Sequence, residues 1–244
     1  MYNFKLRLVN RIVAVSAFHA ETVEYCADYL TDGGEPDASV SVSEGDFAVE
    51  LEKTLKENPD GPIPDEKMLE VTIVLRKIAE ALVDFGIILF HASAVALDEE
   101  AYLFTAKSGT GKSTHTRLWR EAFGERAVMI NDDKPFIELT EDGATVWGSP
   151  WNGKHRTGTN TSAPLKAICV LNRGEHNEIE KMDIMRAFPT VLGQTYRFSD
   201  GEKMKTTLTL VDKMLRRTST YSLRCNMEPE AALVSCNGMR GDTK

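Results

Sequence analysis

A glycine-rich loop joins an apolar strand pattern directly to a helical pattern, and this junction restricts the possible folds more than any other feature of the chain. Residues 101–105, AYLFT, are apolar and β-prone, and residues 113–123, STHTRLWREAF, are typical of an amphipathic helix. Gly109 and Gly111, in the SGTGKS segment between them, allow backbone conformations and close approaches that a side chain would block. The junction predicts an α/β protein in which a mixed sheet is flanked by helices.

The loop itself has the composition of a P-loop. A tight turn between a strand and a helix points successive N–H groups into one concavity, and the start of the helix adds partial positive charge. Lys112 can reach the outer phosphates of a nucleotide, and the hydroxyl of Ser113 is a suitable ligand for Mg²⁺. Ala106 stands where the full GxxxxGK[ST] pattern has its first glycine, so the start of the loop is expected to differ slightly. We therefore predict a site for Mg²⁺ and a nucleoside triphosphate such as ATP, or a similar polyphosphate, formed by Ser108, Gly109, Thr110, Gly111, Lys112, Ser113 and Thr114.

Two adjacent acidic residues follow the next apolar strand pattern. RAVMI, residues 126–130, leads into Asn131, Asp132 and Asp133. Ligands of α/β sheets bind outside the strand ends, where neighbouring strands bring their last residues together. One carboxylate could then hold Mg²⁺, directly or through water, and the other could accept a proton from an attacking hydroxyl. A solvated turn or a helix cap is the alternative interpretation of this pair.

Three histidines bear on the site. His91 lies in the apolar run IILFHASAVAL, where a buried neutral ring bonded to the backbone is one interpretation. The other places His91 beside the phosphates, because the strand before the P-loop strand is expected to lie next to it. His115 is expected to pack or to face solvent rather than to take part in catalysis. His155 lies between Lys154 and Arg156, in a stretch that either clamps a phosphate or an acidic acceptor or is a basic surface loop.

The chain is expected to have two parts. Residues 37–51, DASVSVSEGDFAVEL, alternate at period two around Glu-Gly-Asp, which predicts a hairpin. The segment NPDGPIP, residues 58–64, interrupts both helices and central strands. It predicts a boundary between a small α+β N-terminal lobe, residues 1–62, and a P-loop domain, residues 63–244.

The other patterns alternate between strands and helices. Asp65 and Gly86 are suitable ends for a helix of about 20 residues. Residues 87–97 are expected to form one buried strand beside the P-loop strand, and the C-terminal tail is expected to be mainly helical. Further expected elements are strands within 2–18, a short helix at 20–31, strands 126–130 and 165–171, a hairpin over 136–147, helices near 183–195, 200–217 and 229–237, and a strand at 220–225.

Composition and charge argue against several classes of protein. The sequence has no apolar run of the roughly 18 residues that a membrane span needs, and MYNFKLRLVNRIVAV carries charges too frequently for a signal peptide. The four cysteines lack the spacing of a metal site, so reduced thiols in a cytoplasmic protein are expected. Residues 31–66 hold eleven acids and two bases, a net charge of −9 in a chain of net charge −8. This balance argues against nucleic-acid binding and indicates a solvated face or a docking surface for a basic partner.

The motifs together resemble a known family. His91-Ala92-Ser93, then AYLFTAKSGTGKST, then VMINDDKP are similar to the catalytic domain of HPr kinase/phosphorylase and, more distantly, to the phosphoenolpyruvate carboxykinase fold. The resemblance spans about residues 88–172. In that family a histidine precedes the P-loop by about this distance, and an Asp-Asp pair ends the next strand. The resemblance implies that Asp132 is the catalytic base, that Asp133 contacts the metal together with Ser113, and that His91 belongs to the catalytic site.

The same resemblance implies an enzyme, a kinase that transfers a phosphoryl group from MgATP to a hydroxyl. The acceptor is expected to be a peptide, a carrier protein or another protein serine, or a small molecule. The segment VWGSPWNGKHR…APLKAICVLNRGEHN resembles a subgroup whose substrate is unassigned. The EIRGLG signature of HPr kinase has no counterpart here, so neither HPr as substrate, nor the phosphorylase reaction, nor a hexamer is implied. A nucleotide-binding regulatory module without turnover and a carboxykinase-like lyase are the alternatives.

Overall fold

The computed structural model describes residues 1–57 and 59–241 and divides into two compact units, unit 1 (Met1–Phe85) and unit 2 (Gly86–Lys244). The boundary therefore follows Phe85, whereas the sequence placed it at 62/63. The reason is helix α3 (Glu66–Leu82), which packs on the strands and helices of unit 1. Asn58, the first residue of the proline-rich segment, lies outside the described residues.

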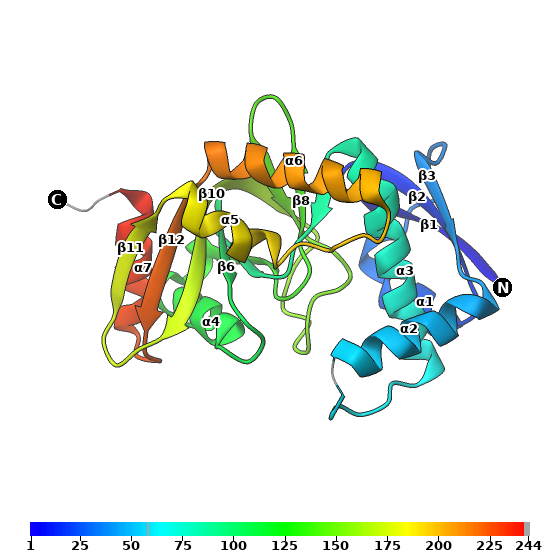
Figure 1. Ribbon diagram of the computed structural model, residues 1–244, viewed down its shortest axis with the longest axis horizontal. Coiled ribbons are helices and arrows are strands. Elements are labelled where there is room, and N and C mark those ends of the chain that lie inside the picture. Colours follow the sequence, from blue (N-terminus) through cyan, green and yellow to red (C-terminus); the bar gives the residue numbers. More distant parts are fainter. Residues whose placement is uncertain (58, 242–244) are drawn as a thin grey trace. The chain divides into compact units, whose positions relative to one another are not determined.

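Unit 1 is a small α+β structure built on a three-stranded sheet (Figure 1). The strands β1 and β2 form an antiparallel hairpin, and β3 pairs with β2 in parallel. Buried aliphatic side chains of the sheet and of α3, such as Val13 and Ile78, form its core. Its elements are β1 (Tyr2–Leu8), β2 (Arg11–Ala17), α1 (Ala20–Tyr25), the 3-10 turn η1 (Ala27–Tyr29), β3 (Ala38–Ser41), α2 (Glu44–Glu57), α3 and the 3-10 turn η2 (Val83–Phe85).

The hairpin expected at residues 37–51 is wrong, because only its first half is a strand. Residues from Glu44 onward form α2, whose start is capped by side-chain hydrogen bonds. The backbone N–H and the hydroxyl of Ser43 both donate to the Asp46 carboxylate, at 2.7 and 2.8 Å. These hydrogen bonds satisfy the N–H of Ser43 and fix the first helical turn, so Glu-Gly-Asp begins a helix and does not turn a hairpin.

Unit 2 is a mixed α/β structure whose nine-stranded sheet is flanked by helices, as the sequence predicted. The strand order is β4-β8-β9-β10-β6-β5-β7, with β12 beside β10 and β11 beside β12. The strands are β4 (Ile87–Leu89), β5 (Ser93–Leu97), β6 (Glu100–Thr105), β7 (Ala127–Asn131), β8 (Phe136–Leu139), β9 (Ala144–Trp147), β10 (Ser162–Arg173), β11 (Glu178–Met182) and β12 (Ser219–Cys225).

The single strand expected over residues 87–97 is divided in two. Its parts, β4 and β5, pair with different neighbours, five positions apart in the strand order. A flat sheet would separate them by about 24 Å, whereas the chain from Leu89 to Ser93 spans at most about 14 Å. The sheet must therefore bend back on itself. The long strand β10 makes this possible, because residues 162–164 pair with β9 and residues 165–173 pair with β6 and β12.

The helices of unit 2 agree with the sequence-based expectations. They are α4 (Lys112–Phe123), the 3-10 turn η3 (Gly124–Arg126), α5 (Ile184–Leu192), α6 (Gly201–Arg217) and α7 (Glu230–Arg240). Helices α4 and α7 pack together on the sheet, where Trp119 lies 4.9 Å from Tyr102 and 5.1 Å from Phe104 between ring centroids. The expected strand at 220–225 is confirmed as β12, but its antiparallel partner β11 was not predicted.

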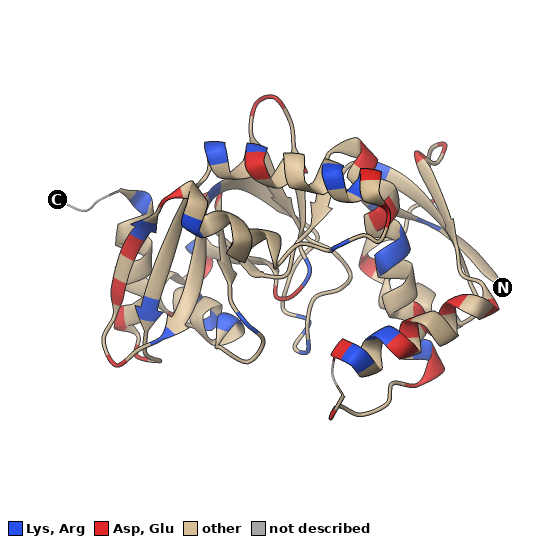
Figure 2. Cartoon of the chain, viewed as in Figure 1, with Lys and Arg blue, Asp and Glu red and all other residues tan. Residues whose placement is uncertain are grey.

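Part of the acidic charge of residues 31–66 is paired with neighbouring bases. Many acids of residues 31–66 pair with bases inside unit 1, including Asp37 with Arg11 and Asp46 with Lys77. Figure 2 shows acidic and basic positions interspersed along α2.

The four cysteines are free thiols. Among residues 1–57 and 59–241, no helix combines the length and apolar character needed to cross a bilayer.

Candidate phosphate-binding site

The direction of the strands brings the predicted site residues to one edge of the sheet. Strand β5 is antiparallel to both of its neighbours, β6 and β7, so β6 and β7 run the same way. The glycine loop follows the end of β6 and the acidic pair follows the end of β7. The segment that carries His91 leads into the start of β5, at this same edge.

The glycine loop adopts the conformation that its composition predicted. Gly109 and Gly111 have φ values of +75° and +119°, in the left-handed region that glycine favours. Gly111 is the residue immediately before α4, so the N–H groups of the loop and of the first helical turn share one concavity. Ala106 is not among the residues with positive φ, and it is therefore compatible with this loop.

Helix α4 is anchored firmly behind the loop. Trp119 donates its indole N–H to the hydroxyl of Ser235 on α7, at 2.8 Å. His115 is 2% exposed and its Nε2 lies 3.0 Å from the same hydroxyl. His115 therefore packs inside the protein, as expected, and the position of the loop is fixed by the contact between α4 and α7.

Lys112, the first residue of α4, is half-buried within the site. Its ammonium group donates to the carbonyl oxygen of Ala106 at 3.3 Å, across the mouth of the loop. Burial lowers the pKa of Lys112, whereas the nearby Asp133 and Asp132 carboxylates act in the opposite direction. An anion bound in the loop would likewise favour the charged ammonium.

The link that carries the acidic pair is shaped by the side chain of Asn131. This residue is fully buried, and its Oδ1 accepts from the N–H groups of Asp133 and Lys134 at 2.8 and 2.7 Å. Its Nδ2 donates to the backbone carbonyl and the hydroxyl of Ser149, both at 3.1 Å. Asn131 therefore fixes the turn by which the chain leaves β7.

Asp132 is held from two sides. Its carboxylate accepts from the hydroxyl of Ser93, at the start of β5, and its N–H donates to Oδ1 of Asn152 at 2.9 Å. The residue is 8% exposed, yet it lines the cavity in front of the loop. A carboxylate that is so constrained and still faces a cavity is suited to act on a bound group.

Asp133 forms a pair with His91. The His91 ring donates from Nε2 to the Asp133 carboxylate at 3.3 Å, and the Lys134 ammonium lies 3.4 Å from the same oxygen. Burial opposes ionisation of Asp133, but the His91 hydrogen bond and the Lys134 charge outweigh it and hold its pKa below the usual value. The backbone supports this pairing, because the N–H of Ala92 donates to the carbonyl of Asp133 at 3.1 Å.

One cavity of about 480 Å³ brings nearly all the predicted residues together. The glycine loop lines it together with the two aspartates, His91 and the 153–155 segment. Thr110 is the exception, since it lines a neighbouring cavity instead. The lining residues are His91, Ser108, Gly109, Gly111, Lys112, Ser113, Thr114, Asp132, Asp133, Gly153, Lys154 and His155.

Sequence reasoning missed the residues that support the acidic pair. Ser93, Ser149 and Asn152 contact Asn131 or Asp132 through hydrogen bonds that join distant parts of the chain. A weak signal existed in the segment GSPWNGKHR, where serine and asparagine precede the basic residues. Nothing in the sequence indicated that this segment folds back onto the end of β7.

The residues present fit a magnesium ion bound together with a polyphosphate. Among the described residues, no group of three or more histidine, cysteine or acidic side chains could hold a metal alone. Mg²⁺ commonly uses one or two carboxylates, water and substrate phosphates, and not a protein cage. The hydroxyl of Ser113 and the carboxylates of Asp132 and Asp133 line the same cavity and supply oxygen ligands of this kind.

Comparisons with known proteins provide little additional information. No protein-family model and no curated protein sequence matches the chain. Among solved structures, the Hpr(Ser) kinase/phosphatase from Coxiella burnetii matches 64% of this chain and 99% of its own, at 10% sequence identity and a TM-score of 0.39. At that TM-score the likeness carries no weight in assigning a function, which must come from the geometry of the cavity.

Proposed function

We propose that unit 2 binds MgATP in this cavity and transfers the γ-phosphoryl group to a hydroxyl of a peptide, a protein or a small molecule. The observation that carries the proposal is the shared cavity, in which a P-loop faces two aspartates and a histidine. Phosphoryl transfer depends mainly on positioning and on charge stabilisation, and these residues can supply both.

The loop would take the phosphates. N–H groups from Ser108 to Thr114 would donate to phosphate oxygens, and Lys112 would exchange its contact with the Ala106 carbonyl for the outer phosphates. Ser113 and Asp133 would hold Mg²⁺, which neutralises charge on the phosphates when bound. His91 and Lys134 keep Asp133 ionised, as a metal ligand must be.

Asp132 would act as the general base. As the acceptor oxygen bonds to the γ-phosphorus, the bond to the β-phosphate oxygen breaks and ADP leaves with the electron pair. The proton of the acceptor hydroxyl moves to the Asp132 carboxylate. Ser93 and Asn152 hold Asp132 in place during this step.

Substitution of each aspartate by asparagine separates the two roles. Asp132→Asn should reduce transfer by about 10² to 10⁴-fold while nucleotide affinity stays within about threefold, because the base acts only in the transfer step. Asp133→Asn should weaken nucleotide affinity and its Mg²⁺ dependence together. Calorimetry measures binding, and labelled ATP with a panel of serine-containing peptides and carrier proteins measures transfer.

The exposed Asp142, in the turn between β8 and β9, provides the matched control. Asp142→Asn should leave both measurements unchanged. Full transfer activity in Asp132→Asn would contradict the base assignment, and equal ATP affinity in wild type and Lys112→Ala would contradict the phosphate site. Tight ATP binding with no transfer to any acceptor would favour a nucleotide-binding regulatory module over a kinase.

A further inference from the structure

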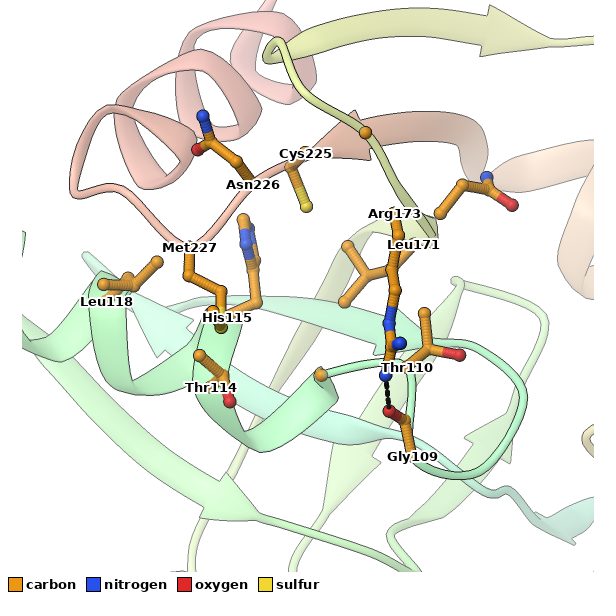
Figure 3. Close-up of a pocket in the computed structure, with 13 residues that line it drawn as sticks. Gly109, Thr110, Thr114, His115, Leu118, Leu171, Arg173, Cys225, Asn226 and Met227 are labelled. Atoms are coloured by element: carbon orange, nitrogen blue, oxygen red, sulfur yellow. Dashed lines mark hydrogen bonds between the residues drawn. The ribbon is translucent and has the colours of Figure 1, made fainter.

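A second cavity lies on the other side of the glycine loop. It has a volume of about 490 Å³ and is lined by the loop, by α4, by the ends of β10 and β12 and by the residues that follow these strands. Figure 3 shows these segments surrounding a common space, with His115 projecting from α4 toward Cys225. The size is within the range of small-molecule binding sites.

Strand topology explains why this cavity forms. Strands β6, β10 and β12 are mutually parallel, so their carboxyl ends meet at one edge of the sheet. This is the edge where α/β proteins bind ligands. The phosphate cavity uses the ends of β6 and β7, and the second cavity uses the ends of β6, β10 and β12, so the glycine loop lies between them.

The two cavities share part of their lining. Gly109, Gly111 and Thr114 contribute to both. A single ligand with a charged part and a less polar part can therefore occupy both at once, passing across the glycines where no side chain intervenes. The second cavity differs in chemistry, because Asp132, Asp133 and Lys112 line only the first.

The walls of the second cavity suit a flat heteroaromatic group. Leu118, Leu171 and Met227 supply apolar surface, and Figure 3 shows the Arg173 side chain crossing from β10 to the loop. Arg173 donates to the Gly109 carbonyl at 2.6 Å, which ties this wall to the phosphate loop. A guanidinium plane also stacks favourably on aromatic rings.

His115 provides an independent indication of a polar ligand. Its Nε2 contacts Ser235, but its buried Nδ1 has no hydrogen-bond partner within the described part of the chain. Burial lowers the pKa of His115 to about 4, so the ring is neutral at physiological pH. A buried polar nitrogen without a partner is uncommon in folded proteins and points to a group that the protein itself does not supply.

We propose that the second cavity holds the nucleoside, base and ribose, of the nucleotide whose phosphates the glycine loop binds. The inference rests on the nucleotide-binding half of the proposed function. It leaves the open side of the phosphate cavity, beside Asp132 and the 153–155 segment, for the acceptor. Inorganic polyphosphate should bind the loop without entering the second cavity.

Cys225 offers a direct probe of occupancy. Figure 3 shows its sulfur pointing into the cavity, and the other three cysteines, Cys26, Cys169 and Cys236, are buried. Burial raises the pKa of the Cys225 thiol, so alkylation with N-ethylmaleimide is carried out near pH 9 to supply thiolate. Peptide mapping by mass spectrometry follows the rate at Cys225 with and without ligands, whose binding is measured by calorimetry in the same buffer.

Saturating MgATP should slow alkylation of Cys225 at least tenfold, whereas saturating inorganic tripolyphosphate should change the rate less than twofold. Equal protection by both ligands, or no protection by bound ATP, would overturn the nucleoside assignment while leaving the phosphate site intact. Failure of both ligands to bind in calorimetry would overturn the proposed function and this inference together.

The reverse experiment uses the adduct to fill the cavity. Wild-type protein alkylated at Cys225 should lose at least tenfold in affinity for ATP and keep its affinity for tripolyphosphate. Cys225→Ser is the matched control, and treatment with the reagent should not change its own affinity for either ligand. Unchanged ATP affinity in the fully alkylated wild type would contradict the proposal.

Discussion

Both units bury an acidic side chain, but they surround it differently. In unit 1, Glu70 on α3 is fully buried, and three donors occupy both of its oxygens. They are the N–H groups of Phe18 and His19 and the hydroxyl of Thr22, at the start of α1. In unit 2, Asp132 is nearly as buried but accepts one side-chain hydrogen bond, from Ser93, and borders a cavity.

This difference distinguishes a structural charge from a functional one. A buried carboxylate whose hydrogen-bonding capacity is used inside the fold can hold elements together but has little left for a ligand. Glu70 therefore joins α3 to the start of α1. Asp132 retains capacity toward the cavity, which is what chemistry on a bound group requires.

The largest expected effect comes from making the same change at both positions. Glu70→Gln should destabilise unit 1 by about 4 kcal/mol, because the amide NH₂ must face at least one of the three donors and leave it unpaired in the interior. Asp132→Asn should cost less than about 1 kcal/mol, since the amide oxygen can still accept from Ser93 and the change relieves repulsion from Asp133. Hydrogen-exchange mass spectrometry of peptides from α1 and α3 measures unit 1. Trp119, Trp147 and Trp151 all lie in unit 2, so their fluorescence follows denaturant unfolding of that unit.

Equal losses of stability in the two variants would show that Asp132 is a structural charge like Glu70. An undisturbed unit 1 in Glu70→Gln would show that the three hydrogen bonds contribute little to holding α1.

A smaller effect is expected from lowering the pH, which should reduce the free energy of unfolding of unit 2 by about 3 kcal/mol. Burial lowers the pKa of His115 to about 4, against an unfolded value of 6.5. The unfolded state therefore binds a proton first, and the contribution of His115 to stability is lost as pH falls from about 6.5 to 4. Tryptophan fluorescence in denaturant at several pH values measures this loss.

His115→Gln should flatten the pH dependence over this range, and His176→Gln, at an exposed position, should leave it as in wild type. A wild-type stability that does not change between pH 6.5 and 4 would mean that His115 can charge without cost, and that its surroundings are more polar than the contacts indicate.

The smallest effect is expected where a charge pair is exposed. Glu52 and Lys56 on α2 lie one helical turn apart with side chains about 70% exposed, and their charged atoms are 2.6 Å apart. Glu52→Gln should change the stability of unit 1 by less than about 0.5 kcal/mol. If the same exchange experiment showed that Glu52→Gln loses nearly as much stability as Glu70→Gln, burial would not explain why the Glu70 carboxylate matters.

Local features of the sequence predicted the centre of the site. The strand, the glycine loop and the helix follow one another directly, and Asp132 and Asp133 end the next strand, so short-range order was enough to bring them together. His91 was also placed near the phosphates, although the strand assigned to it is interrupted at that residue. Its pairing with Asp133 was not foreseen.

Features that depend on distant parts of the chain were not predictable. The second cavity requires the register that brings Arg173 and Cys225 to the same level of the sheet, and the sequence carries no signal for that pairing. The division of residues 87–97 follows from the bend of the whole sheet. The start of α2 was missed for a local reason, because alternating residues concealed the Ser43–Asp46 cap.

The contacts that support the glycine loop have a consequence for protein synthesis. Ser93 and Asp132 are 39 positions apart, Gly109 and Arg173 are 64, and His115 and Ser235 are 120. Contacts of such long range form late, because the chain between them must first be ordered. A nascent chain that has just completed the loop still lacks α7 and the Arg173 wall. If the loop binds nucleotide as proposed, that ability should arise only once α7 has been synthesised and packed against α4, too late for nucleotide to assist the early steps of folding.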